Sequence, residues 1–277
     1  MTTQRKPSRW STVTRTVGNR TVGWHLLRYA VSIGILLLCW WGISELVEHV
    51  KGRAFLPNPV RAIHEMWRLG PTLFRNFWVS AWRLVMALVI AFTLGYPLGL
   101  LIGRERRLDQ LVSPMIYIVY PIPQVAFILP LFLIFGLGNP VKVAIVASAL
   151  FFQILVSARG AAKLIEFEHV TSVRSAGASW WQIYRHVILP ATLPSILTSL
   201  RVSVGLGMAF LFIAETTGSF DPYRGGLGSF IDSNIYSGAQ AFAGILAMAL
   251  LGFSLYIVID VIERIVCRWK YVGRKDS

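Results

Sequence analysis

Charged residues are scarce in this sequence, and acidic residues are fewer than basic ones. Only 14% of the 277 residues are Asp, Glu, Lys or Arg, whereas 55% are hydrophobic. A soluble domain is about one quarter charged, because its surface must be hydrated. The composition therefore excludes an ordinary soluble domain. The length suits one bundle of about six membrane crossings, because each crossing of a ~30 Å hydrocarbon layer takes roughly 20 residues.

Cysteine is also rare, and the sequence lacks a phosphate-binding loop. The two cysteines, Cys39 and Cys267, have no spacing typical of a disulfide framework or a metal site, so no metal is expected. The pattern Gly-x-x-x-x-Gly-Lys-Ser/Thr does not occur. We therefore expect no cofactor in this chain, and any ATP chemistry has to belong to a partner.

The long apolar runs contain almost no ionisable residues. Carriers that couple transport to protons or ions usually need acids inside the membrane, so this scarcity favours an energy source outside it. A secondary carrier or channel for small solutes is the alternative interpretation. An intramembrane enzyme would need paired catalytic groups within the runs. The histidines all lie outside them, at His25, His49, His64, His169 and His186.

Six apolar runs predict an all-α, polytopic membrane protein with about six transmembrane helices. A basic arm, residues 1–28, precedes the first run, and residues 29–277 form the predicted transmembrane domain. A more polar segment, residues 157–194, separates the fourth run from the fifth. The expected spans are 29–47, 79–102, 111–135, 141–156, 195–214 and 241–262.

The net charge of +14 would suit nucleic-acid binding if the basic residues formed a patch on a soluble domain. Instead, most of the 27 Lys and Arg residues lie in segments on the same side of the expected membrane as the N-terminus. Cytosolic loops carry such an excess. We therefore expect both termini in the cytosol, a lipid bilayer around the chain, and no nucleic acid as a partner.

Prolines interrupt the third span. Pro121, Pro123 and Pro130 remove backbone donors, and the freed carbonyls are tolerated in a membrane only inside protein or beside a water-filled cavity. Residues 120–126 are therefore candidates for the lining of a transport pathway, with Gln124 as its polar side chain. A simple kink at a packed interface explains the prolines almost equally well.

Small residues recur at every fourth position in two stripes, which places each stripe on one helix face. Close helix packing is the favoured explanation of both stripes, and a pathway lining is the alternative. Arg83 and Glu215 lie near the expected outer ends of their spans, where Arg83 would extend its charge to water or capture an anion. The stripes are Gly95, Gly99 and Gly103, and Ser195, Ser199, Ser203 and Gly207.

The inner segment, residues 157–194, is patterned as two short helices. Gly177 follows the first helix, at a position that favours a left-handed residue. Ser179 and Gln182 have the spacing of a capping box for the second helix, and Pro190 is expected to end it. The pair either lies in the headgroup layer or docks in a groove of a cytosolic partner. The apolar face of the second helix consists of Trp180, Ile183, Tyr184, Val187 and Ile188.

The most specific pattern is Thr171-Ser172-Val173-Arg174-Ser175-Ala176-Gly177, followed after nine residues by Val187-Ile188-Leu189-Pro190. It resembles the EAA signature of binding-protein-dependent ABC importer permeases, although Thr171 stands where the family usually has Glu. The resemblance covers roughly residue 55 to the end and favours the nitrate, sulfonate, taurine and bicarbonate branch. Further matching motifs are Leu56-Pro57-Asn58-Pro59, Ser80-Ala81-Trp82-Arg83, Pro121-Ile122-Pro123-Gln124, Gly177-Ala178-Ser179, Ala214-Glu215 and Gly225-Gly226-Leu227-Gly228.

This resemblance implies a multi-pass permease subunit of the bacterial plasma (inner) membrane that pairs with a second copy as a homodimer. Cytosolic ATPase subunits that bind ATP and Mg would dock on residues 168–190, and an extracytoplasmic binding protein would deliver a small oxyanion such as nitrate or bicarbonate, or a sulfonate. The coupling residues implied are Thr171, Ser172, Arg174, Gly177, Ala178, Ser179, Trp180, Arg185, Leu189 and Pro190. The pathway candidates are Pro121, Pro123, Gln124, Ser199, Ser203, Arg83 and Glu215.

Overall fold

A computed structural model of the chain contains helices and no strands in the part that it describes. The chain divides into two compact units, residues 1–64 and 65–277. Within the described residues, five helices are long and apolar enough to cross a membrane, and one bent helix pair brings this number up to six. The expected all-α architecture with about six spans is thus confirmed. The described residues are 13–51, 56–165, 167–217 and 225–270.

The first unit is built on one long helix, α1 (Val13–Lys51). Its 39 residues exceed the roughly 20 that a crossing needs, and the candidate span within it is Val31–Val50. The described part of the predicted arm, residues 13–28, therefore belongs to the same helix as the first span. The next helix is α2 (Pro59–Arg68).

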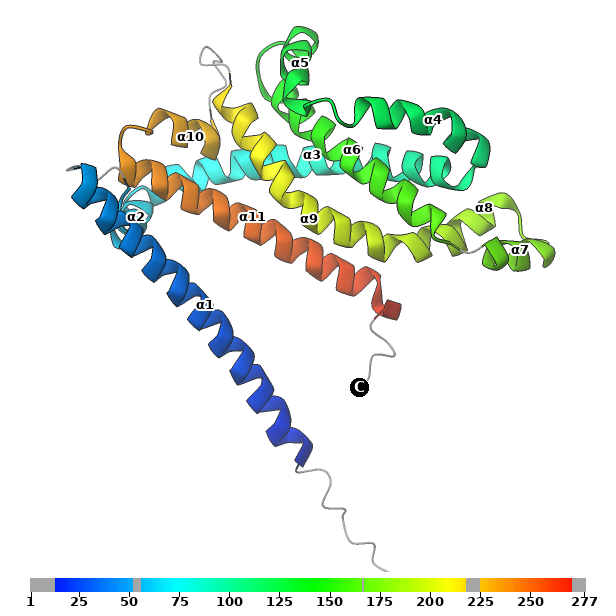
Figure 1. The fold of residues 1–277 in the computed structure, drawn as a ribbon, viewed down its shortest axis with the longest axis horizontal. Helices are drawn as coiled ribbons and strands as arrows, with labels where there is room; N and C mark the ends of the chain where they lie inside the picture. The colour runs from blue at the N-terminus through cyan, green and yellow to red at the C-terminus, as the bar shows by residue number, and fades with distance from the viewer. Residues whose placement is uncertain (1–12, 52–55, 166, 218–224, 271–277) are drawn as a thin grey trace, which may run out of the picture. The chain divides into compact units, whose positions relative to one another are not determined.

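Four long helices form the frame of the second unit (Figure 1). They are α3 (Gly70–Arg104), α6 (Asn139–Lys163), α9 (Leu189–Thr216) and α11 (Gly238–Val266). The contact between α3 and α6 is the most extensive in the unit; α6 also packs against α9, and α9 against α11. Small and aliphatic side chains such as Ala87, Leu150 and Leu211 are fully buried in the shared core.

The glycine stripe of α3 faces α6. A Cβ atom at Gly99 would lie 2.5 Å from Leu155 O and 2.6 Å from Ala158 Cβ, and a Cβ at Gly103 would lie 2.5 Å from Arg159 O. These separations are far below van der Waals contact, so the two backbones approach each other only because side chains are missing. The packing explanation of this stripe is confirmed.

The third span is broken, as its prolines predict. It begins as α4 (Arg106–Val119) and continues as two short helices that are bent by 89° relative to α4. The bend lies at residues 120–123, which include Pro121 and Pro123. The short helices are the 3₁₀ helix η2 (Gln124–Phe127) and α5 (Ile128–Phe135).

Several helix boundaries differ from those expected from hydropathy. α3 begins at Gly70 and α4 at Arg106, whereas the expected starts of the second and third spans are residues 79 and 111. α6 continues to Lys163, whereas the expected end of the fourth span is residue 156. α9 joins the two helices before it without a break, so that one candidate span covers Trp180–Thr216. The expected inner segment, residues 157–194, is therefore shorter. The remaining helices are α7 (Phe167–Ser175), α8 (Trp180–Ile183), η3 (Tyr184–Ile188), α10 (Leu227–Ser233) and η4 (Arg268–Lys270).

We expect Gly99→Ala to lower the free energy of unfolding by about 1–3 kcal/mol, because the added methyl group collides with the backbone of α6. Thermal unfolding of the detergent-solubilised protein measures this loss. Gly205→Ala is the matched control: apart from the backbone of its own helix and its chain neighbours, no atom lies within 4 Å of the added methyl, and Ala favours a helix over Gly. Equal melting temperatures for the two variants would contradict the close α3–α6 contact.

Candidate functional site

The α7–α8 element, residues 167–190, lies where α6 ends and α9 begins (Figure 1). Gly177 ends α7 with a φ of +89°, the left-handed conformation expected for it. Its N–H donates to Arg174 O (2.9 Å), and the N–H of Ala178 donates to Val173 O (3.4 Å). These two bonds make up a Schellman motif, which satisfies the last carbonyl groups of a helix. They fix the turn between α7 and α8.

Ser179 and Gln182 form the predicted capping box at the start of α8. The Ser179 N–H donates to Gln182 Oε1 (2.8 Å), and the Gln182 N–H donates to Ser179 Oγ (3.4 Å). Two donors that a helix start leaves without partners are thereby satisfied. The start of α8 is thus set by local sequence.

Pro190 does not end the second helix, contrary to the expectation. The preceding η3 is a π turn in which Leu189 N–H donates to Tyr184 O, five residues back. A proline ring lacks a donor and needs room beside the preceding turn, and the widened turn supplies this room. Pro190 then lies in the first turn of α9, where proline is tolerated. α8, η3 and α9 consequently form one continuous helical rod.

The expected apolar face of the second helix is buried except at its first residue. Ile183 and Ile188 are buried, and Tyr184 and Val187 are half-buried against the core. Trp180 is 50% exposed because it begins α8, beyond the edge of the core. The apolar face is therefore buried only from Ile183 onward.

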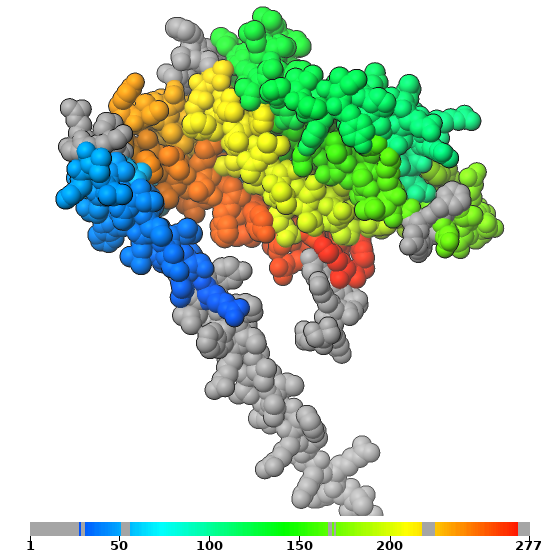
Figure 2. All heavy atoms as spheres, viewed as in Figure 1, coloured from blue at the N-terminus to red at the C-terminus, as the bar shows by residue number. Residues whose placement is uncertain are grey.

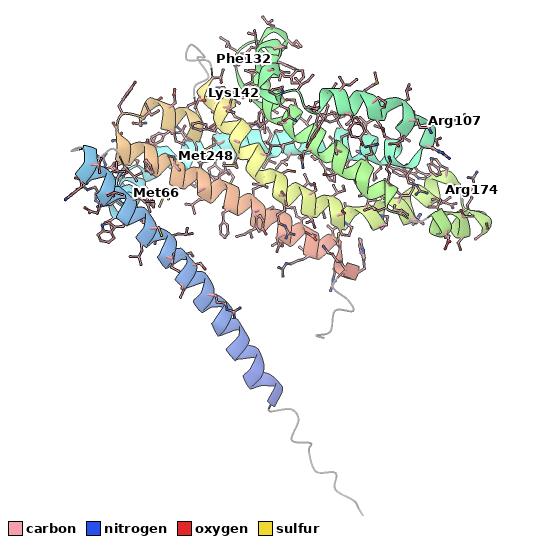
Figure 3. The ribbon with its side chains drawn as sticks, in the orientation of Figure 1. Met66, Arg107, Phe132, Lys142, Arg174 and Met248 are labelled. Carbon is pink, nitrogen blue, oxygen red and sulfur yellow. The ribbon has the colours of Figure 1, made fainter. Side chains whose placement is uncertain are left out.

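The outward surface of the α7–α8 element is polar and aromatic. Trp180 is joined there by Trp181, which is 66% exposed and stacks on Tyr184 with 6.3 Å between ring centroids. Exposed Trp and Arg side chains are typical anchors of protein interfaces. Figure 3 shows Arg174 at this end of the unit, together with Arg107 of α4. The exposed coupling candidates are Thr171, Ser172, Arg174, Gly177, Ser179, Trp180 and Arg185, whereas Ala178, Leu189 and Pro190 are half-buried.

Arg83 and Glu215 meet in a buried polar cluster at the other end of the frame. Arg83 Nη1 lies 2.7 Å from Glu215 Oε1, and the two residues are 1% and 4% exposed. Arg83 also donates through Nε and Nη2 to Asn139 Oδ1 (2.9 and 2.7 Å) and through Nη1 to Gly225 O. The guanidinium is thus surrounded by protein acceptors. The expectation that Arg83 extends its charge to water is wrong, because its partners lie inside the bundle.

Backbone and hydroxyl donors complete the surroundings of Glu215. Ser80 Oγ donates to its carboxylate (2.8 Å to Oε1), and the Gly228 N–H donates to Oε2 (2.7 Å). Gly226 has a φ of +103°, and a Cβ there would lie 2.1 Å from Glu215 Oε1. The glycines therefore leave room for the carboxylate. This Arg83–Glu215 cluster joins α3, α9, the start of α6 and the segment leading into α10.

The remaining pathway candidates fall into two places. At the bend of the third span, Pro121 and Pro123 are exposed and Gln124 is half-buried, while Tyr120 OH donates to Gln153 Oε1 (3.3 Å). Ser199 and Ser203 lie instead on the face of α9 that packs against α6. Ser157 Oγ is 2.7 Å from Ser199 Oγ, and Ser203 is buried and donates to Ser199 O. Helix packing accounts for the contacts of both serines, and a pathway role for them stays a prediction.

Several residues that form buried polar contacts did not stand out in the sequence. Asn139 holds Arg83, and Asp109 pairs with Arg159 and Lys163 at the end of α6. The partners of each pair are far apart in the chain, so no local pattern indicates them. The Gly-rich motif at residues 225–228 is the one local pattern that indicates the Arg83–Glu215 cluster, because its glycines border Glu215.

Comparison with known families and proteins agrees with this architecture. The family model described as binding-protein-dependent transport system inner membrane component matches residues 95–266. The taurine transport system permease protein TauC of Escherichia coli K12 is 30% identical over 260 residues, covering 89% of this chain and 92% of TauC. The aliphatic sulfonates transport permease protein SsuC of Bacillus subtilis 168 is 26% identical, covering 91% of this chain and 90% of SsuC.

Other similar proteins carry different names. The formylaminopyrimidine transport permease protein ThiX of Halalkalibacterium halodurans is 27% identical, covering 85% of this chain and 93% of ThiX. Among solved structures, an inward-facing form of the MetNI methionine ABC transporter has a TM-score of 0.59 at 23% identity. That match covers 72% of this chain and 98% of the matched chain, and at this identity it concerns the fold.

We expect Glu215→Gln to lower the free energy of unfolding by about 3–5 kcal/mol, because Arg83 would keep a buried charge without its counter-ion. Thermal unfolding in detergent and the amount of protein in the membrane measure the loss. Glu65→Gln is the matched control, since Glu65 pairs with the exposed Arg68. It should cost no more than about 1 kcal/mol. A Glu215→Gln protein as stable as this control would disprove the role of the buried pair.

Proposed function

Because the chain belongs to the family of binding-protein-dependent transport system inner membrane components, the permease subunits of ABC importers, we propose that it moves a small sulfonate inward as a homodimer driven by cytosolic ATPases. It is a transport subunit and a multi-pass inner membrane protein. ATP and Mg would be bound by the partner ATPases, and an extracytoplasmic binding protein would deliver the solute. Both termini are proposed to face the cytosol, as the distribution of Lys and Arg indicates.

The α7–α8 element carries the proposed coupling to the ATPases. Its outward surface presents Trp180, Trp181 and Arg185, while Ile183 and Ile188 hold it to the core. Because α8, η3 and α9 form one rod, a displacement of the docked element is also a displacement of α9. Nucleotide binding that brings two ATPases together would thus switch the bundle between inward-facing and outward-facing states.

The bend of the third span supports a pathway between two copies of the chain. Residues 120–126 expose Pro121 and Pro123 beside backbone that belongs to no long helix. Such backbone in a membrane has to be buried in protein or line a water-filled cavity. α5, which follows, exposes Leu129, Leu133 and Ile134 by 69%, 79% and 73%. A second copy packed in a symmetric dimer would cover this apolar surface and enclose a cavity at the bend.

The solute proposal rests on the two relatives named for taurine and aliphatic sulfonates. We expect cells that express the chain with its ATPase and binding protein to accumulate labelled taurine, with methanesulfonate competing and nitrate and bicarbonate having no effect. Cells without the chain are the control. Uptake of nitrate or bicarbonate in place of taurine would assign the transporter to those oxyanions.

We expect Gly177→Asp to abolish uptake without preventing membrane insertion, because a side chain at φ +89° strains the turn that places α8. Uptake and the amount of membrane-inserted protein are measured together. Gly136→Asp is the matched control: Gly136 also has a positive φ (+67°) and an open surrounding, but it lies beyond the other end of α6. Normal uptake by Gly177→Asp would rule out the proposed coupling at this turn.

A secondary carrier or channel is distinguished by its partners. The proposed function requires an ATPase subunit to co-purify with the chain in detergent and to be cross-linked from a photoreactive residue at position 180 or 185. A carrier or channel would yield lipid cross-links and ATP-independent uptake. That result would disprove the proposed coupling to an ATPase, and only the membrane fold would remain supported.

A further inference from the structure

A polar cluster links α4 to the last two turns of α6, next to the α7–α8 element. Asp109 Oδ1 lies 2.7 Å from Arg159 Nε, and Asp109 Oδ2 lies 2.6 Å from Lys163 Nζ. Ser113 Oγ donates to Asp109 Oδ1 (3.0 Å) and accepts from Arg159 Nη2 (2.5 Å). The Arg159 guanidinium also lies 5.6 Å from the centre of the Tyr117 ring. We call these five residues the Asp109 cluster.

The cluster connects two helices whose backbones are not closely packed. α4 packs its backbone mainly against α3, and the long side chains of the cluster bridge it to α6, beside which it lies in Figure 2. Arg159 and Ser113 are buried, and the side chain of Asp109 is 18% exposed. Charges shielded in this way from water attract each other more strongly than exposed ones. Asp109 therefore attaches α4 to α6 mainly through Arg159, since the side chain of Lys163 is 42% exposed.

The position of the cluster relates it to the α7–α8 element. Lys163 is the last residue of α6, only a few residues before α7. In the same linker, Ile165 O accepts a hydrogen bond from Arg104 Nη1 (3.2 Å) at the end of α3. A displacement of α7 would therefore act first on the part of α6 that forms ion pairs with Asp109. α4 in turn leads into the bend at residues 120–123.

We propose that Asp109 is a positioning residue that transmits movement of the α7–α8 element through α6 to α4 and to the bend of the third span. This inference rests on the proposed function, in which the element docks on an ATPase and the bend lines the pathway. Asp109 makes α4 follow the end of α6 as one body. Without the carboxylate, ATP hydrolysis continues, but α4 and the bend no longer move with the end of α6.

The experiment uses the whole transporter, with ATPase and binding protein, in proteoliposomes. The readout is the amount of solute moved per ATP hydrolysed, which a loss of folded protein alone does not change. We expect Asp109→Asn to lower this ratio about tenfold, within the range typical of coupling between sites. Asp109→Glu keeps the charge and should restore most of the ratio. Glu65→Gln removes a carboxylate from a surface pair and should leave the ratio unchanged.

A cross-link tests whether α4 and α6 move together. In a chain with Cys39 and Cys267 replaced by Ser, Asp109→Cys and Lys163→Cys are joined by a short bis-methanethiosulfonate reagent. The cross-linked transporter should regain the ratio that Asp109→Cys alone loses, and reduction of the cross-link should lower it again. Inhibition by the cross-link would show that α4 and α6 have to separate, which overturns the proposal.

The outcomes separate this inference from the function on which it rests. If no ATPase co-purifies and uptake needs no ATP, the proposed function fails. If the ATPase is bound and drives uptake, but Asp109→Asn leaves the ratio unchanged, only the role of Asp109 is disproved. A lowered ratio that Asp109→Glu restores supports both.

Discussion

The close contact between α3 and α6 is the constraint on which the second unit depends. Helices in a bilayer gain little from the hydrophobic effect when they associate, because lipid is as apolar as their side chains. Close packing and polar contacts have to supply the attraction. Gly99 and Gly103 allow the backbones to approach, which brings many atoms into contact at once. Around this pair, the Arg83–Glu215 cluster attaches α9 and the segment before α10 at one end, and the Asp109 cluster attaches α4 at the other.

The Arg83–Glu215 cluster shows why several short motifs are needed together. A buried ion pair is tolerated only when hydrogen bonds satisfy the remaining donors and acceptors. Asn139 and Gly225 supply the acceptors for Arg83, while Ser80 and the Gly228 N–H supply donors for Glu215. These groups come from four separate stretches of the chain. Motifs that look unrelated along the sequence therefore contribute to one buried site, and each supplies only part of its hydrogen bonds.

Most features set by local backbone chemistry were predicted from the sequence, although Pro190 does not end its helix. Features set by distant partners were not predicted. The left-handed Gly177, the capping box at Ser179 and the break at Pro121 and Pro123 follow from their immediate neighbours. The end of α6 was placed too early because Arg159 and Lys163 look like the start of a polar loop. Their charges are compensated by Asp109, roughly fifty positions away along the chain, so the helix continues. Hydropathy reports which residues are apolar, and it does not report which charges are paired.

The straight and bent segments of the second unit indicate where a displacement of the α7–α8 element would be absorbed. The α7–α8 element is attached to α6 on one side and is continuous with α9 on the other, and both helices pack in the frame with α3. A displacement of the element is therefore carried by long, stiff helices. The sharpest break within the described spans is the 89° bend between α4 and η2, where prolines remove backbone donors. A displacement of stiff helices is taken up where the regular helical hydrogen bonds are interrupted. The same prolines that prevent a straight third span thus make residues 120–123 the place where a displacement of the α7–α8 element would be taken up.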